Sequence, residues 1–277
     1  MKQRILLLTT LTMIAFAANS ILCRLALKQT SIDAASFTTI RLISGALMLS
    51  LIIRGRDGKL AGNWRSALAL FAYAACFSFS YLSLPASTGA LLLFGAVQTT
   101  MLAYGFGQGE RFLPRQWLGI SCAIGGLIVL LLPGLTMPPL QGALLMLISG
   151  LAWGIYSLRA KGSGDPTCAT AGNFVRASVF AIVLVMFQAL FHPLSIPLAG
   201  LVYALLSGAI ASGLGYAIWY TVLRDLNASS AATVQLSVPV LAALGGVILL
   251  GEILSLRLVI SAIAILGGIA LVISTKH

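Results

Sequence analysis

The polar and aromatic side chains that could contact a solute lie inside long apolar stretches of the chain. Nine of them are candidate substrate-binding residues: Asn19, Tyr73, Phe77, Gln98, Trp153, Tyr156, Tyr216, Tyr220 and Gln235. An amide in an apolar setting needs partners, and it can accept from an ammonium group or donate to a carboxylate. Most of the aromatic residues form pairs three or four positions apart, which share a helix face and could stack on a planar solute. Ordinary packing, or an aromatic belt at the membrane interface, is the alternative role for the same spacing.

Acidic residues and histidines are missing from these stretches. All six acidic residues and both histidines fall in expected loops or at helix ends: Asp33, Asp57, Glu110, Asp165, Asp225, Glu252, His192 and His277. A buried carboxylate is the usual proton relay of a pump and the usual counter-charge for a cationic drug. The pattern therefore disfavours proton-driven export of multivalent cations and favours downhill, facilitated efflux of a neutral or zwitterionic solute.

No motif for a metal, a cofactor or catalysis accompanies the candidates. The four cysteines lie far apart without a CxxC pair, which indicates neither a zinc site nor a disulfide framework. The sequence has no P-loop, HExxH or GxSxG motif, so we expect no cofactor, no metal and no enzyme activity. The expected partners are a small solute and membrane lipids. A monomer would suffice, and the number of protomers stays open.

The elements that must position the candidates are membrane-spanning helices. Of 277 residues, 59% are hydrophobic and 8% are charged, whereas soluble domains carry about 25% charge. A bilayer core about 30 Å thick needs roughly 20 apolar residues per helix, and unpaired backbone in lipid favours helices over strands. We predict an all-α polytopic protein with ten helices, near 4–23, 33–54, 64–83, 86–107, 113–132, 140–160, 170–191, 198–221, 229–250 and 256–273. The first of these also resembles a cleavable secretory signal, but its apolar run is longer than such a signal needs, so we interpret it as a membrane helix.

The net charge of +11 reflects sidedness rather than nucleic-acid binding, because no groove-reading motif accompanies it. With ten spans, twelve of the seventeen Lys and Arg residues fall on the side of the N-terminus and three on the other side. The remaining two, Arg41 and Arg176, lie within helices. Because cytoplasmic loops are enriched in cations, both termini are predicted to be cytoplasmic.

The chain contains an internal repeat. A shift of 142 residues superimposes four features: Ser87 on Ser229, Gly109-Glu110 on Gly251-Glu252, Arg115 on Arg257, and Gly125-Gly126 on Gly267-Gly268. A shift of 135 places Arg24 on Arg159 and Arg41 on Arg176. Each half, 1–133 and 134–277, holds five expected helices, and an odd number inverts the second half in the membrane. A duplication kept only for packing is the alternative.

Several of these repeated positions have expected roles outside solute contact. Glu110 and Glu252 precede the fifth and tenth expected helices, where a carboxylate can cap free N–H groups, so both are predicted to be structural helix caps. Arg24 and Arg159, at the expected ends of the first and sixth helices, are predicted anchors or gates. Arg41 and Arg176 are expected to pair with carbonyls or lipid headgroups, with attraction of a substrate carboxylate as the alternative.

Candidate hinges interrupt the fourth and ninth expected helices. They are Gly89, Gly95, Pro239, Gly245 and Gly246. Pro removes a backbone hydrogen bond and Gly eases bending, so these positions are candidate gating or hinge residues. Close helix packing through small residues is the alternative for the glycines.

Each expected five-helix half contains a Gly-Glu pair, a downstream basic residue and a Gly-Gly pair. This set of motifs resembles the EamA-type repeat of the drug/metabolite transporter superfamily. The likeness covers essentially the whole chain, and its overall character is most similar to the YddG-type exporters of aromatic amino acids. It implies a ten-helix carrier of the bacterial inner membrane, with a cavity lined by the first, third, fourth, sixth, eighth and ninth helices and with the fifth and tenth at the periphery. It also implies export of amino acids, including aromatic ones, by alternating access. A carrier of another drug or metabolite class, or a non-transport assembly protein, remains the alternative.

Overall fold

Every regular element in the described part of the chain is a helix. The computed structural model describes residues 2–55, 58–109, 113–132, 138–160, 164–223 and 234–274. Its helices are α1 (Lys2–Gln29), α2 (Ala34–Arg54), α3 (Trp64–Ser80), α4 (Ala86–Gly107), α5 (Pro114–Leu131), α6 (Leu140–Ala160), α7 (Pro166–Phe191), α8 (Leu198–Leu205), η1 (Leu206–Leu214), α9 (Gly215–Leu223), α11 (Ser237–Leu250) and α12 (Leu256–Ser274). Residues 234 and 235 are also helical, and a turn at Leu236 separates them from α11. The all-helical prediction is confirmed.

Seven helical segments of the described chain are long and apolar enough to cross a membrane, by length and composition. They are Gln3–Gln29, Ala34–Arg54, Ala86–Gly107, Pro114–Leu131, Leu140–Ala160, Pro166–Phe191 and Leu198–Leu223. Two shorter apolar helices, Ser237–Leu250 and Leu256–Val272, follow them. These segments make the chain a multi-pass membrane protein.

Several helices begin or end away from their predicted limits: α3 ends at Ser80 instead of near residue 83, and α1 and α7 differ further. Helix α1 continues to Gln29, so Arg24 is part of the helix and not of a loop, and the predicted end near residue 23 is wrong. Helix α7 begins at Pro166 and not near residue 170, because Asp165 caps it by accepting the N–H of Thr167 at 2.8 Å. Pro fits the first helical position, where its missing N–H is not needed.

The outer surface is apolar and the interior holds polar groups. Large apolar side chains on α7 are strongly exposed, among them Leu190 and Phe191, whereas Asn19, Arg41 and Gln98 are buried. This distribution is the reverse of a soluble protein and fits a surface covered by lipid. The buried polar groups therefore need partners inside the bundle.

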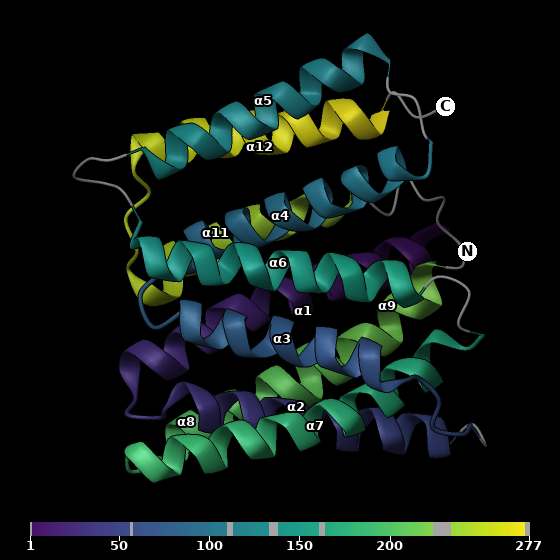
Figure 1. Ribbon diagram of the computed structural model, residues 1–277, viewed down its shortest axis with the longest axis vertical. Coiled ribbons are helices and arrows are strands. Elements are labelled where there is room, and N and C mark those ends of the chain that lie inside the picture. The colour runs from purple at the N-terminus through teal and green to yellow at the C-terminus, as the bar shows by residue number, and fades with distance from the viewer. Residues whose placement is uncertain are drawn as a thin grey trace.

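The helices lie roughly parallel, with α5 and α12 at one edge and α2, α7 and α8 at the other (Figure 1). The remaining helices lie between them, and the start of α1 and the end of α12 lie at the same end of the bundle (Figure 1). Helices α5 and α12 cross very closely at Gly119 and Gly268, where a Cβ on either glycine would clash with the carbonyl of the other. Gly268 belongs to the repeated Gly-Gly pair, which therefore serves helix packing.

A π-helical stretch interrupts the helical segment Leu198–Leu223. The π-helix η1 spans Leu206–Leu214 and leads directly into α9. At Gly208 the backbone of η1 approaches the carbonyl of Arg41 so closely that a Cβ would clash. Such π segments are frequent at functional sites. Here the segment lies next to the helix that carries the buried Arg41.

Candidate functional site

A narrow cavity with polar and aromatic walls lies between the helices. Its lining consists of Phe16, Asn19, Ser20, Tyr73, Phe77, Leu93, Phe94, Trp153, Tyr216 and Gln235. These residues come from α1, α3, α4, α6, α9 and the short stretch before α11. Because α9 belongs to the eighth expected helix and the stretch before α11 to the ninth, these are the six expected helices to which the family resemblance assigned the cavity. The space measures about 30 Å³. It can hold water but not a solute of amino-acid size, so a larger solute needs the helices to separate.

Six of the nine predicted substrate residues line this cavity: Asn19, Tyr73, Phe77, Trp153, Tyr216 and Gln235. Gln98 does not line it, although it is buried on α4. Gln98 lies one helical turn after Phe94, and Phe94 is the residue of that pair that lines the cavity.

Tyr156 and Tyr220 lie beside the cavity and serve as a link between helices. The Tyr156 hydroxyl donates to Thr170 Oγ1 at 3.1 Å, and the Thr170 hydroxyl donates to Tyr220 Oη at 3.1 Å. This chain of bonds joins α6, α7 and α9. Both tyrosines are therefore held by the protein's own groups and are absent from the cavity lining.

Trp153 is the centre of the aromatic wall. Its ring lies 5.3 Å from Tyr216 at 22°, a stacked arrangement, and 4.8 Å from Tyr73 at 46°. Tyr73 continues to Phe77 at 5.5 Å, and Tyr216 to Phe16 at 5.5 Å. The wall thus joins rings from α1, α3, α6 and α9. Aromatic faces of this kind can hold a planar or apolar group by stacking.

Four lining residues were missed by the sequence analysis. Phe16 lies three positions before Asn19, and that spacing could have placed it on the same face. Ser20, Leu93 and Phe94 give no such signal, because a small hydroxyl or an apolar side chain in a membrane helix is ordinary composition.

Asn19 connects the cavity to the π-helix. Its Oδ1 accepts the hydroxyl of Ser207 at 2.8 Å, and its Nδ2 donates to Ser212 Oγ at 3.2 Å. Both serines belong to η1. An amide nitrogen carries two hydrogens, so one remains for a solute after these bonds.

Arg41 lies directly behind the cavity wall, contrary to the expected pairing with carbonyls or lipid headgroups. It is 1% exposed, and its Nη2 donates to Tyr73 Oη at 2.9 Å. Its Cζ lies 4.7 Å from the Phe77 ring centroid and 5.3 Å from that of Tyr73. Its repeat partner Arg176 does show the expected pairing, because its Nη1 donates to the carbonyls of Ala61 at 2.8 Å and Gly172 at 2.9 Å.

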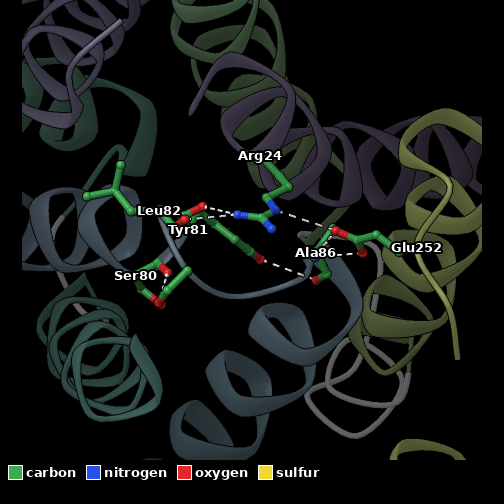
Figure 2. A network of polar contacts seen from close by, with 7 residues as sticks. Arg24, Ser80, Tyr81, Leu82, Ala86 and Glu252 are labelled. Atoms are coloured by element: carbon green, nitrogen blue, oxygen red, sulfur yellow. Dashed lines mark hydrogen bonds and ion pairs between the residues drawn. The ribbon is translucent and has the colours of Figure 1, made fainter. Parts of the chain in front are cut away.

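A polar network closes one end of the bundle around Arg24 (Figure 2). Arg24 Nη1 donates to the carbonyls of Tyr81 at 2.8 Å and Leu82 at 3.2 Å, and its Nε lies 3.6 Å from Glu252 Oε1. The Glu252 oxygens accept the N–H of Ala86 at 3.0 and 2.9 Å. We call this set, Arg24, Tyr81, Leu82, Ala86 and Glu252, the Arg24 network. It joins α1, the α3–α4 turn and the α11–α12 turn.

Glu252 caps a helix other than the one expected. Its carboxylate lies at the N-terminus of α4, whereas the predicted target was α12. The N–H of Glu252 bonds to the Gly246 carbonyl at 3.0 Å, and Gly251 adopts a positive φ of 63°, so the turn folds back along α11. The start of α12 is served instead by Ser255, whose Oγ accepts the N–H of Leu258 at 3.1 Å. The matching Glu110 lies outside the described residues.

Three of the five candidate hinge residues occupy close packing positions, and two of them, Gly89 and Gly246, lie against this network. A Cβ at Gly89 would clash with the Tyr81 ring, one at Gly245 would clash with Ile21, and one at Gly246 would lie 2.6 Å from Glu252 Oε2. Gly95 meets only Ile265 at an ordinary 3.6 Å. Pro239 lies near the start of α11. A hinge role for these residues stays a prediction.

The opposite end is joined by a second network around Arg159. Its Nε donates to Ser66 Oγ at 3.1 Å and its Nη2 to Asn63 Oδ1 at 3.3 Å. The N–H of Asn63 in turn donates to Asn173 Oδ1 at 2.9 Å. We call these four residues the Arg159 network. It links α3, α6 and α7 at the end where α1 begins, so the cavity lies between two polar closures.

Two larger hollows lie elsewhere and have different chemistry. One, of about 190 Å³, lies among α4, α5 and α12, and another, of about 450 Å³, lies among α4, α11 and α12. Their walls are almost wholly apolar, which suits lipid chains better than a polar solute. The smaller central cavity is therefore the candidate site.

Comparison with known proteins assigns this architecture to a group of carriers. The EamA-like transporter family matches residues 140–274. An uncharacterised protein of Pseudomonas aeruginosa is 58% identical over 99% of this chain and 96% of its own length. The threonine/homoserine exporter RhtA of Escherichia coli is 28% identical over 81% of this chain and 76% of its own length. A crystal structure that is 21% identical shares the fold, with a TM-score of 0.68 over 97% of this chain and 99% of the other. Closeness to YddG-type exporters stays a prediction.

Proposed function

Because this chain belongs to the EamA-like transporter family, we propose that it exports small neutral or zwitterionic metabolites, in particular amino acids, across the bacterial inner membrane. The observation that carries the proposal is the central cavity. It combines amides from Asn19 and Gln235 with an aromatic wall, and the described residues that line it include no carboxylate. Amides suit the charged ends of a zwitterion and rings suit its side chain. The likeness to an exporter of threonine and homoserine supports the same class of solute.

The proposed carrier has ten membrane helices in two inverted halves, 1–133 and 134–277. Exchange of the halves pairs α2 with α7, α4 with α11 and α5 with α12, and the members of each pair pack against each other. The repeat-related Arg24 and Arg159 lie in closures at opposite ends of the bundle. An inverted repeat places related residues on opposite sides of the membrane, so these observations support it.

Transport is proposed to proceed by alternating access between the two networks. With both termini cytoplasmic, the Arg24 network closes the outer side and the Arg159 network the inner side. The cavity is too small for an amino acid when both are formed. Opening one network at a time would admit a solute from one side and release it to the other.

The test is counterflow into liposomes that contain the purified protein, with radiolabelled phenylalanine, tryptophan, threonine and alanine. Saturable exchange that is unchanged by an imposed pH gradient is the expected result, because no acidic group in the described cavity lining can relay a proton. Exchange that requires a pH gradient would refute the facilitative mechanism. Absence of exchange above empty liposomes for every amino acid would refute the substrate class.

A further inference from the structure

Arg41 carries a buried positive charge for which the described residues provide no counter-charge. The acidic residues within the described ranges are engaged elsewhere: Asp33 and Asp165 cap the starts of α2 and α7, and Glu252 pairs with Arg24. A guanidinium stays protonated in proteins. An isolated buried charge is costly, and structures normally compensate it with an ion pair or a set of hydrogen bonds.

The compensation that Arg41 does receive is partial. The rings of Phe77 and Tyr73 lie within cation–π range, and Nη2 donates to Tyr73 Oη at 2.9 Å. Its Nη1 is buried without a hydrogen-bond partner. Tyr73 uses its oxygen as the acceptor toward Arg41, so its own hydroxyl hydrogen is free to donate. Arg41 Nη1 and the Tyr73 hydroxyl are therefore two donors at one place for which the described residues provide no acceptor.

The rings that cover Arg41 are the rings that line the solute cavity. Tyr73 and Phe77 both belong to the cavity lining and both contact the guanidinium. The guanidinium therefore lies behind two residues of the cavity lining. The repeat-related Arg176 offers nothing comparable, because its Nη1 already donates to two carbonyls and lies at the end near the α2–α3 connection.

We propose that Arg41, together with the Tyr73 hydroxyl, binds the carboxylate of the transported solute. This inference rests on the proposed function and narrows it: the carrier selects solutes with a free carboxylate, such as α-amino acids, over amides, amines and neutral compounds. A planar guanidinium matches a carboxylate with two parallel hydrogen bonds. The remaining N–H of Asn19 can also donate to the carboxylate, the amide oxygen of Gln235 can accept from the ammonium group, and the solute side chain can stack on the Trp153 wall.

The first test measures binding without transport. Thermal stabilisation of the purified protein is titrated with phenylacetate and, in parallel, with phenylacetamide, which has the same ring but no charge. The wild type should bind the carboxylate at least about tenfold more tightly, since a hydrogen bond to a charged group contributes about a factor of ten or more to affinity. Arg41→Gln should abolish this preference, and the matched control Arg176→Gln should keep it. Equal binding of the two compounds by the wild type would overturn the proposal even if Arg41→Gln fails to fold.

The second test separates this proposal from the proposed function. In counterflow, unlabelled phenylalanine should compete with labelled phenylalanine at least about tenfold better than phenylalaninamide does, by the same interaction. Flux with equal competition by both compounds would overturn the Arg41 site and leave amino-acid transport standing. Arg41-dependent binding of phenylacetate without any amino-acid flux would leave the anion site standing and overturn amino-acid transport.

Discussion

Removing the Glu252 carboxylate should open the Arg24 network, the proposed outer closure, and lower the stability of the protein. Glu252 caps α4 through Ala86 and pairs with Arg24, and its side chain is 5% exposed against 12% for Arg24. Loss of a helix cap costs about 0.5–2 kcal/mol. Loss of one partner of a buried pair costs about 3–5 kcal/mol when burial is complete. The distance of 3.6 Å and the residual exposure of Arg24 make the expected loss for Glu252→Ala smaller than for a completely buried pair, at about 2–4 kcal/mol.

The assay combines thermal unfolding with cavity accessibility. Glu252→Ala should lower the unfolding temperature in detergent and raise the rate at which an impermeant thiol reagent, added from the outer side, labels a cysteine introduced in the cavity. The matched control is Asp33→Asn at the same end. Asp33 also caps a helix, by accepting the N–H of Ser36 at 2.8 Å, but forms no ion pair among the described residues. If the two variants have the same stability and the same labelling rate, the Arg24 network is not a closure.

Three further outcomes follow from the geometry. Trp153→Ala should reduce amino-acid counterflow about two- to tenfold with expression retained, because it removes a lining ring on which the solute can stack, a contact of about 0.5–1.5 kcal/mol. Gln98→Ala should have a smaller effect, and equal effects in counterflow would contradict the assigned lining. Tyr156→Phe should lower unfolding stability by about 0.5–1.5 kcal/mol through the lost bond to Thr170 while substrate affinity stays unchanged, and a changed affinity would place Tyr156 in the site. Gly119→Leu should destabilise the α5–α12 crossing by about 1–3 kcal/mol in thermal unfolding, and wild-type stability would show that the close approach is not needed.

The helices could be predicted from the sequence because lipid imposes length and apolarity on each of them. The end of α1 could not, because Arg24 looks like a boundary residue when read alone. The helix continues through Arg24 since this side chain is satisfied by Glu252 and by the α3–α4 turn, contacts that join positions far apart in the chain. Glu252 was assigned to the wrong helix for the same reason, because Ala86, whose N–H it accepts, lies far from it in the sequence.

The candidate site could be predicted in part. Asn19 and Trp153 were found because a polar or paired aromatic residue inside an apolar stretch is conspicuous, and both line the cavity. Gln98 and Tyr156 carry the same signal but lie off the lining, since the rotation of a helix against its neighbours is set by packing and not by spacing within that helix. Arg41 shows this limit most clearly. A shift of 135 residues places Arg41 on Arg176, but the two side chains have different surroundings.

The central claim is that the exported solute occupies the cavity between α1, α3, α6 and α9. The most direct measurement is thiol labelling of Ser20→Cys in a variant whose four native cysteines are replaced. The control is Leu190→Cys, on the exposed surface of the helix bundle. The account predicts that labelling at position 20 blocks counterflow, that saturating phenylalanine or threonine slows this labelling, and that labelling at position 190 does neither. Full counterflow after complete labelling at position 20 would show that the solute takes another path.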